Sequence, residues 1–262
     1  MGKLLEIRNL TRKYYEGTRE SRVIDNINLE VDEKEFVIIM GASGSGKTSL
    51  LHLMAGIDNA DEGTIRYKNV DFGQMSEKEK TVFRRTNIGI VFQQNCLIPD
   101  LTVYENIMLP LMLDRGKGKR KGKENEKDTI TKLCGQVGLE EHIRKYPSQL
   151  SGGQQQRAAI LRSIINRPPL LLCDEPTGSL NSAQTEIVMR LLNVLNKKGQ
   201  TIVLVTHDMK VAVKGRRVVY IKDGRVSGEL RFSETNPNET NEKEVYRRRE
   251  EELLNFLQKR GY

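Results

Sequence analysis

The chain has 262 residues, of which 37% are hydrophobic and 30% are charged, and its formal net charge is +8. This composition is typical of a globular protein with one domain, or one domain and a lobe. No apolar run approaches the roughly 18 residues of a membrane-spanning helix, and we expect no secretory signal because the N-terminus lacks a long apolar core. Three scattered cysteines argue against a disulfide framework or a zinc site and suit a reducing cytoplasm; they are Cys96, Cys134 and Cys173.

Much of the positive charge is concentrated in residues 114–123, which carry six positive charges and one negative charge. This stretch is rich in glycine and poor in apolar residues, which predicts a solvated loop. The alternative is a contact with an anionic membrane surface or with a partner protein.

Residues 4–10 and 23–31 alternate apolar and polar side chains, which predicts two half-buried antiparallel strands. Residues 12–17, between them, are polar and are expected to form a loop. A tyrosine in this loop, Tyr14 or Tyr15, either stacks on a nucleotide base or is an ordinary surface residue, and the pattern alone favours neither.

Residues 36–40 are apolar, as in a strand buried on both faces of a parallel sheet. A glycine-rich stretch separates this strand from a helical segment, and its spacing is that of a phosphate-binding loop, where backbone N–H groups and the helix N-terminus face phosphate oxygens. Lys47 would contact the β- and γ-phosphates, the Thr48 hydroxyl would bind Mg²⁺, and Ser49 could reach another phosphate oxygen. The loop predicts binding of a nucleoside triphosphate and consists of Gly41, Ala42, Ser43, Gly44, Ser45, Gly46, Lys47 and Thr48.

The following segments alternate between strand and helix patterns. After a turn at residues 58–63 and a strand over 64–69, Ser76 and Glu79 form a capping box that predicts a helix over 76–85. A buried strand over 88–92 leads into Gln93. From about residue 94 to 168 the spacing is helical, which predicts a helical lobe inserted into the sheet domain. Its helices are expected over residues 102–113, 127–137, 140–146 and 150–166.

Buried strands also end in polar residues further along the chain. Asp174 and Glu175 stand at the end of the apolar run 170–175, and His207 follows the strand expected over 201–205. An amphipathic helix over 182–198 and a closing hairpin over 218–231 complete an α/β pattern. Ligands of such sheets bind at the carboxyl ends of the strands. Residues that each follow a strand could therefore meet there: Gly41, Gln93, Asp174 and His207.

The two carboxylates at the end of this strand have different predicted roles. Asp174 could hold Mg²⁺ beside Thr48. Glu175 points differently because side chains alternate along a strand, and it could polarise water for attack on the γ-phosphate. His207 is a candidate to contact the γ-phosphate and to orient Glu175 or the water.

A second anion site is predicted at residues 150–157, where Ser-Gly-Gly opens a helix and leaves backbone N–H groups unpaired. The domain thus has two predicted helix N-termini that could bind phosphate. A simple kinase or GTPase does not need the second one.

With this stretch, Leu-Ser-Gly-Gly-Gln-Gln-Gln, the chain resembles ATP-binding cassette (ABC) ATPases over about residues 3–231. The resemblance implies an α/β P-loop NTPase fold with a mixed, mainly parallel core sheet, an N-terminal antiparallel β-subdomain and an inserted helical subdomain at about 94–168. The ATPase domain would span residues 1–232, and residues 233–262 would add a flexible linker and a C-terminal helix that packs on its own domain or on a partner.

The family also implies that two ATPase domains pair head to tail around ATP. The ATP held by Lys47 of one copy would be capped by the signature residues of the other, which are Ser151, Gly152, Gly153 and Gln154. Tyr14 matches the adenine-stacking aromatic, with Tyr15 as the fallback. Gln93 matches the glutamine that touches Mg²⁺ and water and senses the membrane partner.

Finer motifs, such as 92–94, 97–107 and 174–178, are similar to the MacB-like branch of macrolide exporters, lipoprotein-release ATPases and bacitracin-type resistance transporters. This branch implies a cytoplasmic ATPase on the inner face of the membrane that drives a separate permease in export or mechanical work. The alternatives are an ABC ATPase acting on nucleic acid, which we do not expect, and a regulatory cell-division type. One departure is Asn181, where the family usually has Asp, and we hypothesise slower or less coupled hydrolysis.

Overall fold

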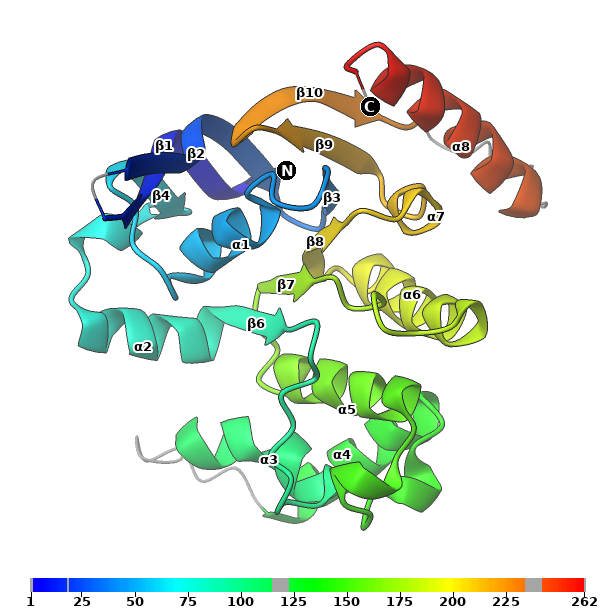
Figure 1. Cartoon of the computed structure of the whole chain (residues 1–262). Helices are drawn as coiled ribbons and strands as arrows, with labels where there is room; N and C mark the ends of the chain where they lie inside the picture. The colour runs from blue at the N-terminus through cyan, green and yellow to red at the C-terminus, as the bar shows by residue number, and fades with distance from the viewer. Residues whose placement is uncertain (1, 18, 115–122, 234–241, 262) are drawn as a thin grey trace.

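The computed structural model describes residues 2–17, 19–114, 123–233 and 242–261, and the ten strands of these residues form two sheets (Figure 1). The larger sheet has the order β10-β9-β3-β8-β7-β6, with all neighbours parallel except β10 and β9. Its strands are β3 (Phe36–Met40), β6 (Ile88–Val91), β7 (Leu170–Asp174), β8 (Thr201–Thr206), β9 (Arg217–Lys222) and β10 (Arg225–Arg231). The mixed, mainly parallel core sheet expected from the sequence is confirmed.

The smaller sheet is antiparallel and has the order β2-β1-β4-β5. Its strands are β1 (Lys3–Glu16), β2 (Arg19–Asp32), β4 (Glu62–Tyr67) and β5 (Val70–Asp71). Two predictions were wrong here. Residues 12–16 belong to β1, because their backbone pairs with β2 at Tyr14↔Ser21 and Tyr15↔Glu20. Glu62 and Gly63, predicted in a turn, begin β4 because β4 pairs with β1.

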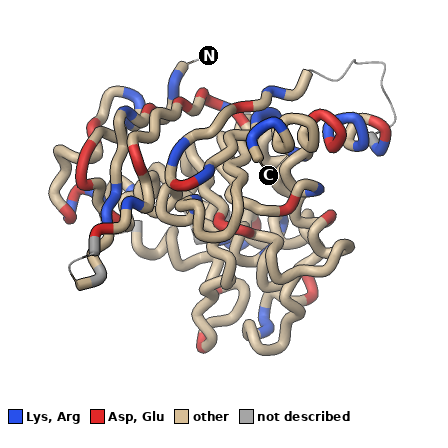
Figure 2. Tube along the Cα trace, turned by 45° about the horizontal axis from the view of Figure 1, so that its top comes forward, with Lys and Arg blue, Asp and Glu red and all other residues tan. Residues whose placement is uncertain are grey.

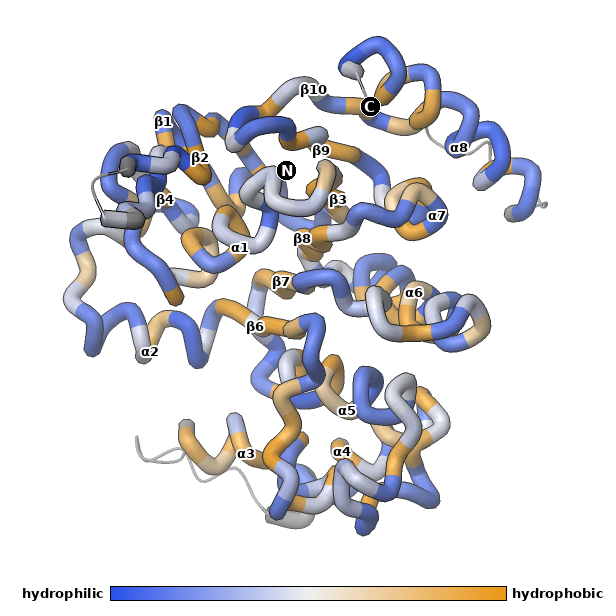
Figure 3. Tube along the Cα trace, in the orientation of Figure 1, coloured by the Kyte–Doolittle hydropathy of each residue, from blue (hydrophilic) through white to orange (hydrophobic). Residues whose placement is uncertain are grey.

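The central strands are buried because they separate two apolar layers. Val37 and Ile39 of β3 face the cluster with α1 (Lys47–Ala55) and the small sheet, whereas Phe36, Ile38 and Met40 face the other cluster. Figure 3 shows the resulting hydrophobic colouring of β6, β7 and β8. The apolar runs of the sequence therefore mark strands covered on both faces.

Helices flank the parallel sheet, and the three α-helices between β6 and β7 lie below it in Figure 1. The chain between β6 and β7 contains α3 (Val103–Asp114), α4 (Lys123–Gln136) and α5 (Gly152–Ile164), and we keep residues 94–168 as a proposed helical subdomain. Helix α2 (Glu77–Asn87) begins with the predicted capping box of Ser76 and Glu79. The prediction of a helix over 140–146 was wrong, since only Glu140–His142 forms a short 3-10 turn. Residues 115–122 of the basic stretch lie outside the described residues.

The remaining helices are α6 (Ser182–Lys197), α7 (Met209–Ala212) and α8 (Glu242–Gln258). Helix α8 contacts α7, and charges of both signs lie interspersed along it (Figure 2). Leu253 and Leu257 are fully buried, and Arg249 donates to the carbonyl oxygens of Val213 and Gly215. The terminal helix thus packs on its own domain; residues 234–241 of the predicted linker lie outside the described residues. No helix in the described ranges is both long and apolar enough to cross a membrane.

Candidate active site

A cavity of about 760 Å³ lies at the carboxyl ends of the parallel strands. It brings together residues from the phosphate loop, the segment after β6, the end of β7 and the end of β8. Sequence reasoning missed one wall residue, Val23, whose only signal was its place at the start of an alternating strand. The cavity is lined by Val23, Gly41, Ala42, Ser43, Gly44, Gly46, Lys47, Thr48, Ser49, Gln93, Glu175 and His207.

The phosphate loop requires glycine at two positions for different reasons. A Cβ at Gly41 would overlap the carbonyl oxygen of Ile221, and Gly46 adopts a φ of 97° directly before α1. The curled backbone leads into the N-terminus of α1. The hydroxyl of Ser45 is buried and has no hydrogen-bond partner among the described residues. The glycine backbone and the N-terminus of α1 line the cavity and form a cradle that fits an anionic ligand with several acceptor oxygens, whereas Ser45 is not among the lining residues.

Lys47 provides the positive charge of this loop. Its Nζ donates to the carbonyl oxygen of Ala42 at 2.6 Å, and burial lowers the pKa of the amine while Glu175 and Asp174 oppose that shift. The lysine is therefore held against the loop, where a phosphate would stabilise its charged form.

Thr48 and Asp174 form the first hydrogen-bonded pair of the site. The Thr48 hydroxyl donates to Asp174 Oδ1 at 3.0 Å, which joins the start of α1 to the end of β7. Asp174 is only 7% exposed, and burial raises the pKa of its carboxyl group although the Thr48 hydrogen bond opposes the shift. Adjacent hydroxyl and carboxylate oxygens are ligands that Mg²⁺ prefers, so the two residues fit this ion.

Glu175 and His207 form the second pair. His207 Nδ1 lies 2.9 Å from Glu175 Oε1, and the backbone N–H of Glu175 donates to the carbonyl oxygen of Val205 at 3.0 Å. Glu175 has a φ of 42°, in the left-handed region that a glutamate rarely adopts. Gln93 is close by: a Cβ on Gly178 would lie 3.3 Å from both Gln93 Nε2 and Glu175 Oε2. The strained turn directs the carboxylate into the cavity beside the glutamine.

The signature residues lie elsewhere. Ser151 caps α5, accepting from the backbone N–H of Gln154, and Gln154 Nε2 lies 2.7 Å from His142 Nε2. Ser151 and Gly152 are exposed, whereas Gly153 is buried against Gln184. None of the four predicted signature residues is among the residues that line the phosphate-loop cavity. Within one chain the two predicted anion sites are therefore separate.

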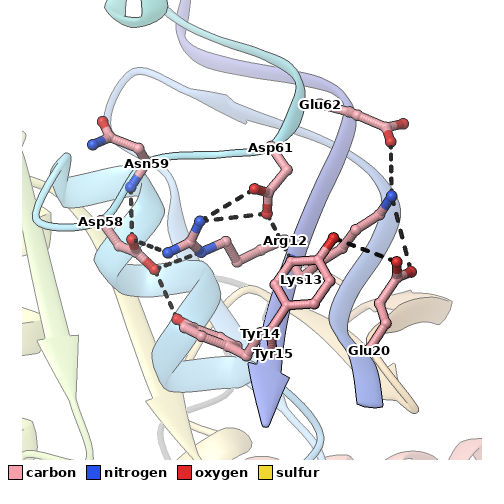
Figure 4. A network of polar contacts seen from close by, with 9 residues as sticks. All are labelled: Arg12, Lys13, Tyr14, Tyr15, Glu20, Asp58, Asn59, Asp61 and Glu62. Atoms are coloured by element: carbon pink, nitrogen blue, oxygen red, sulfur yellow. Dashed lines mark hydrogen bonds and ion pairs between the residues drawn. The ribbon is translucent and has the colours of Figure 1, made fainter. Parts of the chain in front are cut away.

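Tyr14 belongs to a polar network that joins β1 to the loop after α1 (Figure 4). Its hydroxyl donates to Asp58 Oδ2 at 2.7 Å, and the Arg12 guanidinium lies 4.8 Å from the centre of its ring. Arg12 also donates to both oxygens of Asp58. Tyr14 is 41% exposed, Tyr15 is 66% exposed, and neither is among the residues that line the cavity. The structure holds Tyr14 in place but does not bring it into the phosphate site.

Asn181, the unusual residue of the sequence, is the N-cap of α6. Its Oδ1 accepts from the backbone N–H of Gln184 at 2.9 Å, and the Gln184 side chain in turn accepts from Arg157 at 3.2 Å. Because a Cβ on Gly153 would overlap Gln184, the start of α6 abuts the signature helix of the same chain.

A comparison with known proteins identifies relatives along most of the chain. The family model described as ABC transporter matches residues 24–178. The lipoprotein-releasing system ATP-binding protein LolD of Syntrophotalea carbinolica is 38% identical over 226 residues, which are 86% of this chain and 97% of LolD. The macrolide export ATP-binding/permease protein MacB of Pasteurella multocida is 39% identical over 223 residues, which are 85% of this chain but 34% of that longer protein.

Solved structures are known for a third relative. The ABC transporter ATP-binding protein MJ0796 of Methanocaldococcus jannaschii is 43% identical over 228 residues, covering 86% of this chain and 96% of the relative. A dimeric structure of MJ0796 matches with a TM-score of 0.80, covering 88% of this chain and all of that one. A second MJ0796 dimer, described as a post-hydrolysis state bound to ADP and Pi, also matches with a TM-score of 0.80.

Proposed function

Because the chain belongs to the ABC transporter family of ATPases, we propose that it hydrolyses ATP to ADP and phosphate and thereby drives a separate membrane permease. The observation that carries this proposal is the meeting of two hydrogen-bonded pairs at one phosphate loop: Thr48 with Asp174, and Glu175 with His207. These pairs supply a metal-binding hydroxyl and carboxylate, and a base with an orienting partner, beside an anion cradle.

Thr48, Asp174 and Gln93 are the residues that would hold Mg²⁺. The ion would neutralise negative charge on the phosphate oxygens of ATP. The buried Asp174 supports this assignment, since a carboxylate with a raised pKa is stabilised in its ionised form by a neighbouring cation.

Glu175 is the proposed base. Its carboxylate would accept a hydrogen bond from the attacking water and draw its proton, and His207 would hold the carboxylate at Oε1 and face the γ-phosphate. Lys47 would bind the β- and γ-phosphates, with the backbone N–H groups of residues 41–46 and the Ser49 hydroxyl around the remaining oxygens.

The exposed signature suggests how the site is completed. Ser151 and Gly152 lie at the surface with the N-terminus of α5, and the solved relative MJ0796 is a dimer. We propose that two copies pair head to tail, so that residues 151–154 of each copy cap the ATP on the phosphate loop of the other. Tyr14, held by Asp58 and Arg12, would stack on the adenine.

The relatives also suggest the cellular role. LolD and MacB are described as parts of lipoprotein-releasing and macrolide-exporting systems. We propose an ATPase on the cytoplasmic face of the membrane whose permease exports or extracts hydrophobic or antimicrobial cargo, as in drug or peptide-antibiotic resistance.

The test is an affinity purification of the tagged chain from detergent-solubilised membranes of its own cells, with phosphate release measured before and after reconstitution. We expect a membrane-spanning partner to co-purify and to change the rate of ATP hydrolysis, whereas Lys47→Ala should hydrolyse no ATP with or without the partner. Capture of RNA or DNA with no membrane protein would contradict the transport role while leaving the ATPase activity intact. A membrane partner that binds but moves no cargo would favour the regulatory type.

A further inference from the structure

A second cavity, of about 730 Å³, lies at the opposite end of the parallel strands from the phosphate loop. Helices α4 and α6, which both contact α5, form its walls, and the loops before β7 and β8 close it. It shares no lining residue with the first cavity. It is therefore distinct from the phosphate-loop cavity, and Arg157, the last residue of the predicted anion stretch 150–157, is one of its lining residues.

The walls of this second cavity are mainly apolar. Its volume is in the range of small-molecule sites, which are lined by hydrophobic side chains with a few placed polar groups. Two wall residues of α6, Ile187 and Val194, are 45% and 41% exposed. The apolar lining consists of Leu133, Val137, Leu161, Ile164, Ile165, Pro168, Pro169, Ile187, Leu191, Val194 and Leu195.

The charged residues of the second cavity are all positive. Arg167, Arg190 and Lys198 lie exposed at its rim, and Arg157 lies inside. No Asp or Glu is among its described lining residues, and none of these four cations forms an ion pair within the described ranges. A rim of this kind attracts negative charge.

Arg157 is the group that points most directly to a ligand. It is only 7% exposed, its one side-chain hydrogen bond joins the uncharged Gln184 at 3.2 Å, and its Nε has no partner among the described residues. Burial lowers the pKa of this guanidinium. A buried cation without a carboxylate costs free energy that an anion would recover, and a guanidinium binds carboxylate or phosphate through two parallel hydrogen bonds.

We propose that the second cavity binds an anionic amphiphile, a single-chain molecule with an apolar body and one carboxylate or phosphate head group. The head group pairs with Arg157, and the apolar body lies between α4, α5 and α6. The rim cations draw the anion in.

The test is calorimetric titration of the full-length protein with dodecanoate, dodecyl phosphate, neutral dodecyl maltoside and dodecyltrimethylammonium, all below their micelle concentrations. Hydrogen bonds to charged groups contribute about 1.5–3 kcal/mol, so we expect both anionic probes to bind saturably, and about 10- to 100-fold more tightly than the neutral or cationic probe.

Substitutions test whether the anionic probes bind in this cavity. Arg157→Gln should remove the preference for the anionic probes, and Arg144→Gln, the same change on an exposed arginine outside the cavity, should leave it unchanged. Because Arg157 is buried, the exposed pair Arg190→Glu and Lys198→Glu provides a second test that does not depend on tolerance of a core change. It should weaken anion binding about tenfold or more.

Several results would overturn the proposal. Equal affinity for dodecanoate and dodecyl maltoside would show that the cavity binds apolar chains without selecting an anionic head group. Anion binding that survives Arg157→Gln and the rim pair would place the ligand elsewhere. Failure of both anionic probes, together with binding of an acidic amphipathic helical peptide that is lost in Arg157→Gln, would replace the amphiphile by a partner helix.

Discussion

At the residue scale, the candidate site combines groups that are individually unfavourable in the unliganded protein. Glu175 has a φ of 42°, Asp174 is a buried carboxylate with a raised pKa, and Ser45 has a buried hydroxyl without a partner. Each costs free energy that surrounding packing must offset, and such costs concentrate where a ligand or a reaction requires them. Substitutions at these positions should therefore separate stability from activity.

Glu175→Gln should abolish turnover without unfolding the protein. Gln can keep the hydrogen bond to His207 but cannot accept a proton from water, so we expect phosphate release to fall by at least about 100-fold. ATP should still bind and should hold two copies together, which size-exclusion chromatography with ATP would detect. A variant that remains monomeric in saturating ATP would count against the proposed head-to-tail dimer, in which each copy caps the ATP of the other.

Asp174→Asn should increase the stability of the unliganded protein while impairing hydrolysis. Because the folded-state pKa of Asp174 is raised by burial, its favourable contribution is present at low pH and is lost as the pH rises through that raised pKa. Asn does not ionise, so the variant does not lose this stability, and its Tm should exceed that of the wild type near neutral pH. The difference in Tm should shrink as the pH falls toward 4.

Thermal melts across this pH range would measure the Asp174 effect, with Asp100→Asn as the control because Asp100 is exposed and forms no side-chain hydrogen bond or ion pair among the described residues. With Mg²⁺ and ATP the order should reverse, since the wild-type carboxylate gains a cation. A Tm difference that is constant with pH would show that titration of Asp174 is not its cause.

Asn181→Asp should change the ATPase rate with little effect on folding. Both residues cap helices well, and Asn181 serves here as the cap of α6, so we expect the stability to change by less than about 0.5 kcal/mol. The rate and the cooperativity of hydrolysis should rise if the carboxylate aids communication between two sites. Asn181→Ala is the control, because it removes the cap at a cost of about 1 kcal/mol without adding a carboxylate. Unchanged kinetics in Asn181→Asp would refute the coupling hypothesis.

At the scale of elements, the parts predicted from sequence were those with a local cause. The apolar runs of β3 and β7 and the capping box of α2 depend on neighbouring residues, so pattern alone located them. The extension of β1 to Glu16 depends on pairing with β2, and the support of Tyr14 comes from Asp58, 44 residues away. Tertiary packing likewise places Val23 in the wall of the first cavity and forms the second cavity beside Arg157. No short-range pattern could reveal these non-local features.

Helix α8 offers a direct test of an element whose docking the sequence left open. Leu253 is fully buried against the domain, whereas its neighbour Leu254 is 41% exposed. Leu253→Ala should lower the free energy of unfolding by about 2–5 kcal/mol, and Leu254→Ala should change it by less than about 0.5 kcal/mol. Denaturant titration would measure both. Equal, small effects would mean that burial of Leu253 does not stabilise the packing of α8 on the domain.

At the scale of the whole molecule, the phosphate-loop cavity and the signature residues lie apart within one chain. The cavity contains the loop, Glu175 and His207, while Ser151 and Gly152 are exposed at the start of α5 and line no part of it. In the proposed model each chain holds two half-sites, which a head-to-tail pair of chains would join; the solved relative MJ0796 is itself dimeric. This model makes a prediction that a site complete within one chain does not make.

Two inactive variants should restore activity when mixed. Lys47→Ala damages the loop, and Gly152→Asp damages the signature with little strain, since a Cβ at Gly152 lies 3.7 Å from its nearest neighbour, Leu180 Cδ2. In a mixed dimer, the intact loop of the Gly152→Asp chain faces the intact signature of the Lys47→Ala chain, which forms one complete site. The mixture should therefore release phosphate faster than the sum of its separately measured parts. A chain carrying both substitutions should instead inhibit the wild type, because a mixed dimer then contains no complete site, and a strictly additive rate in both mixtures would contradict the shared site.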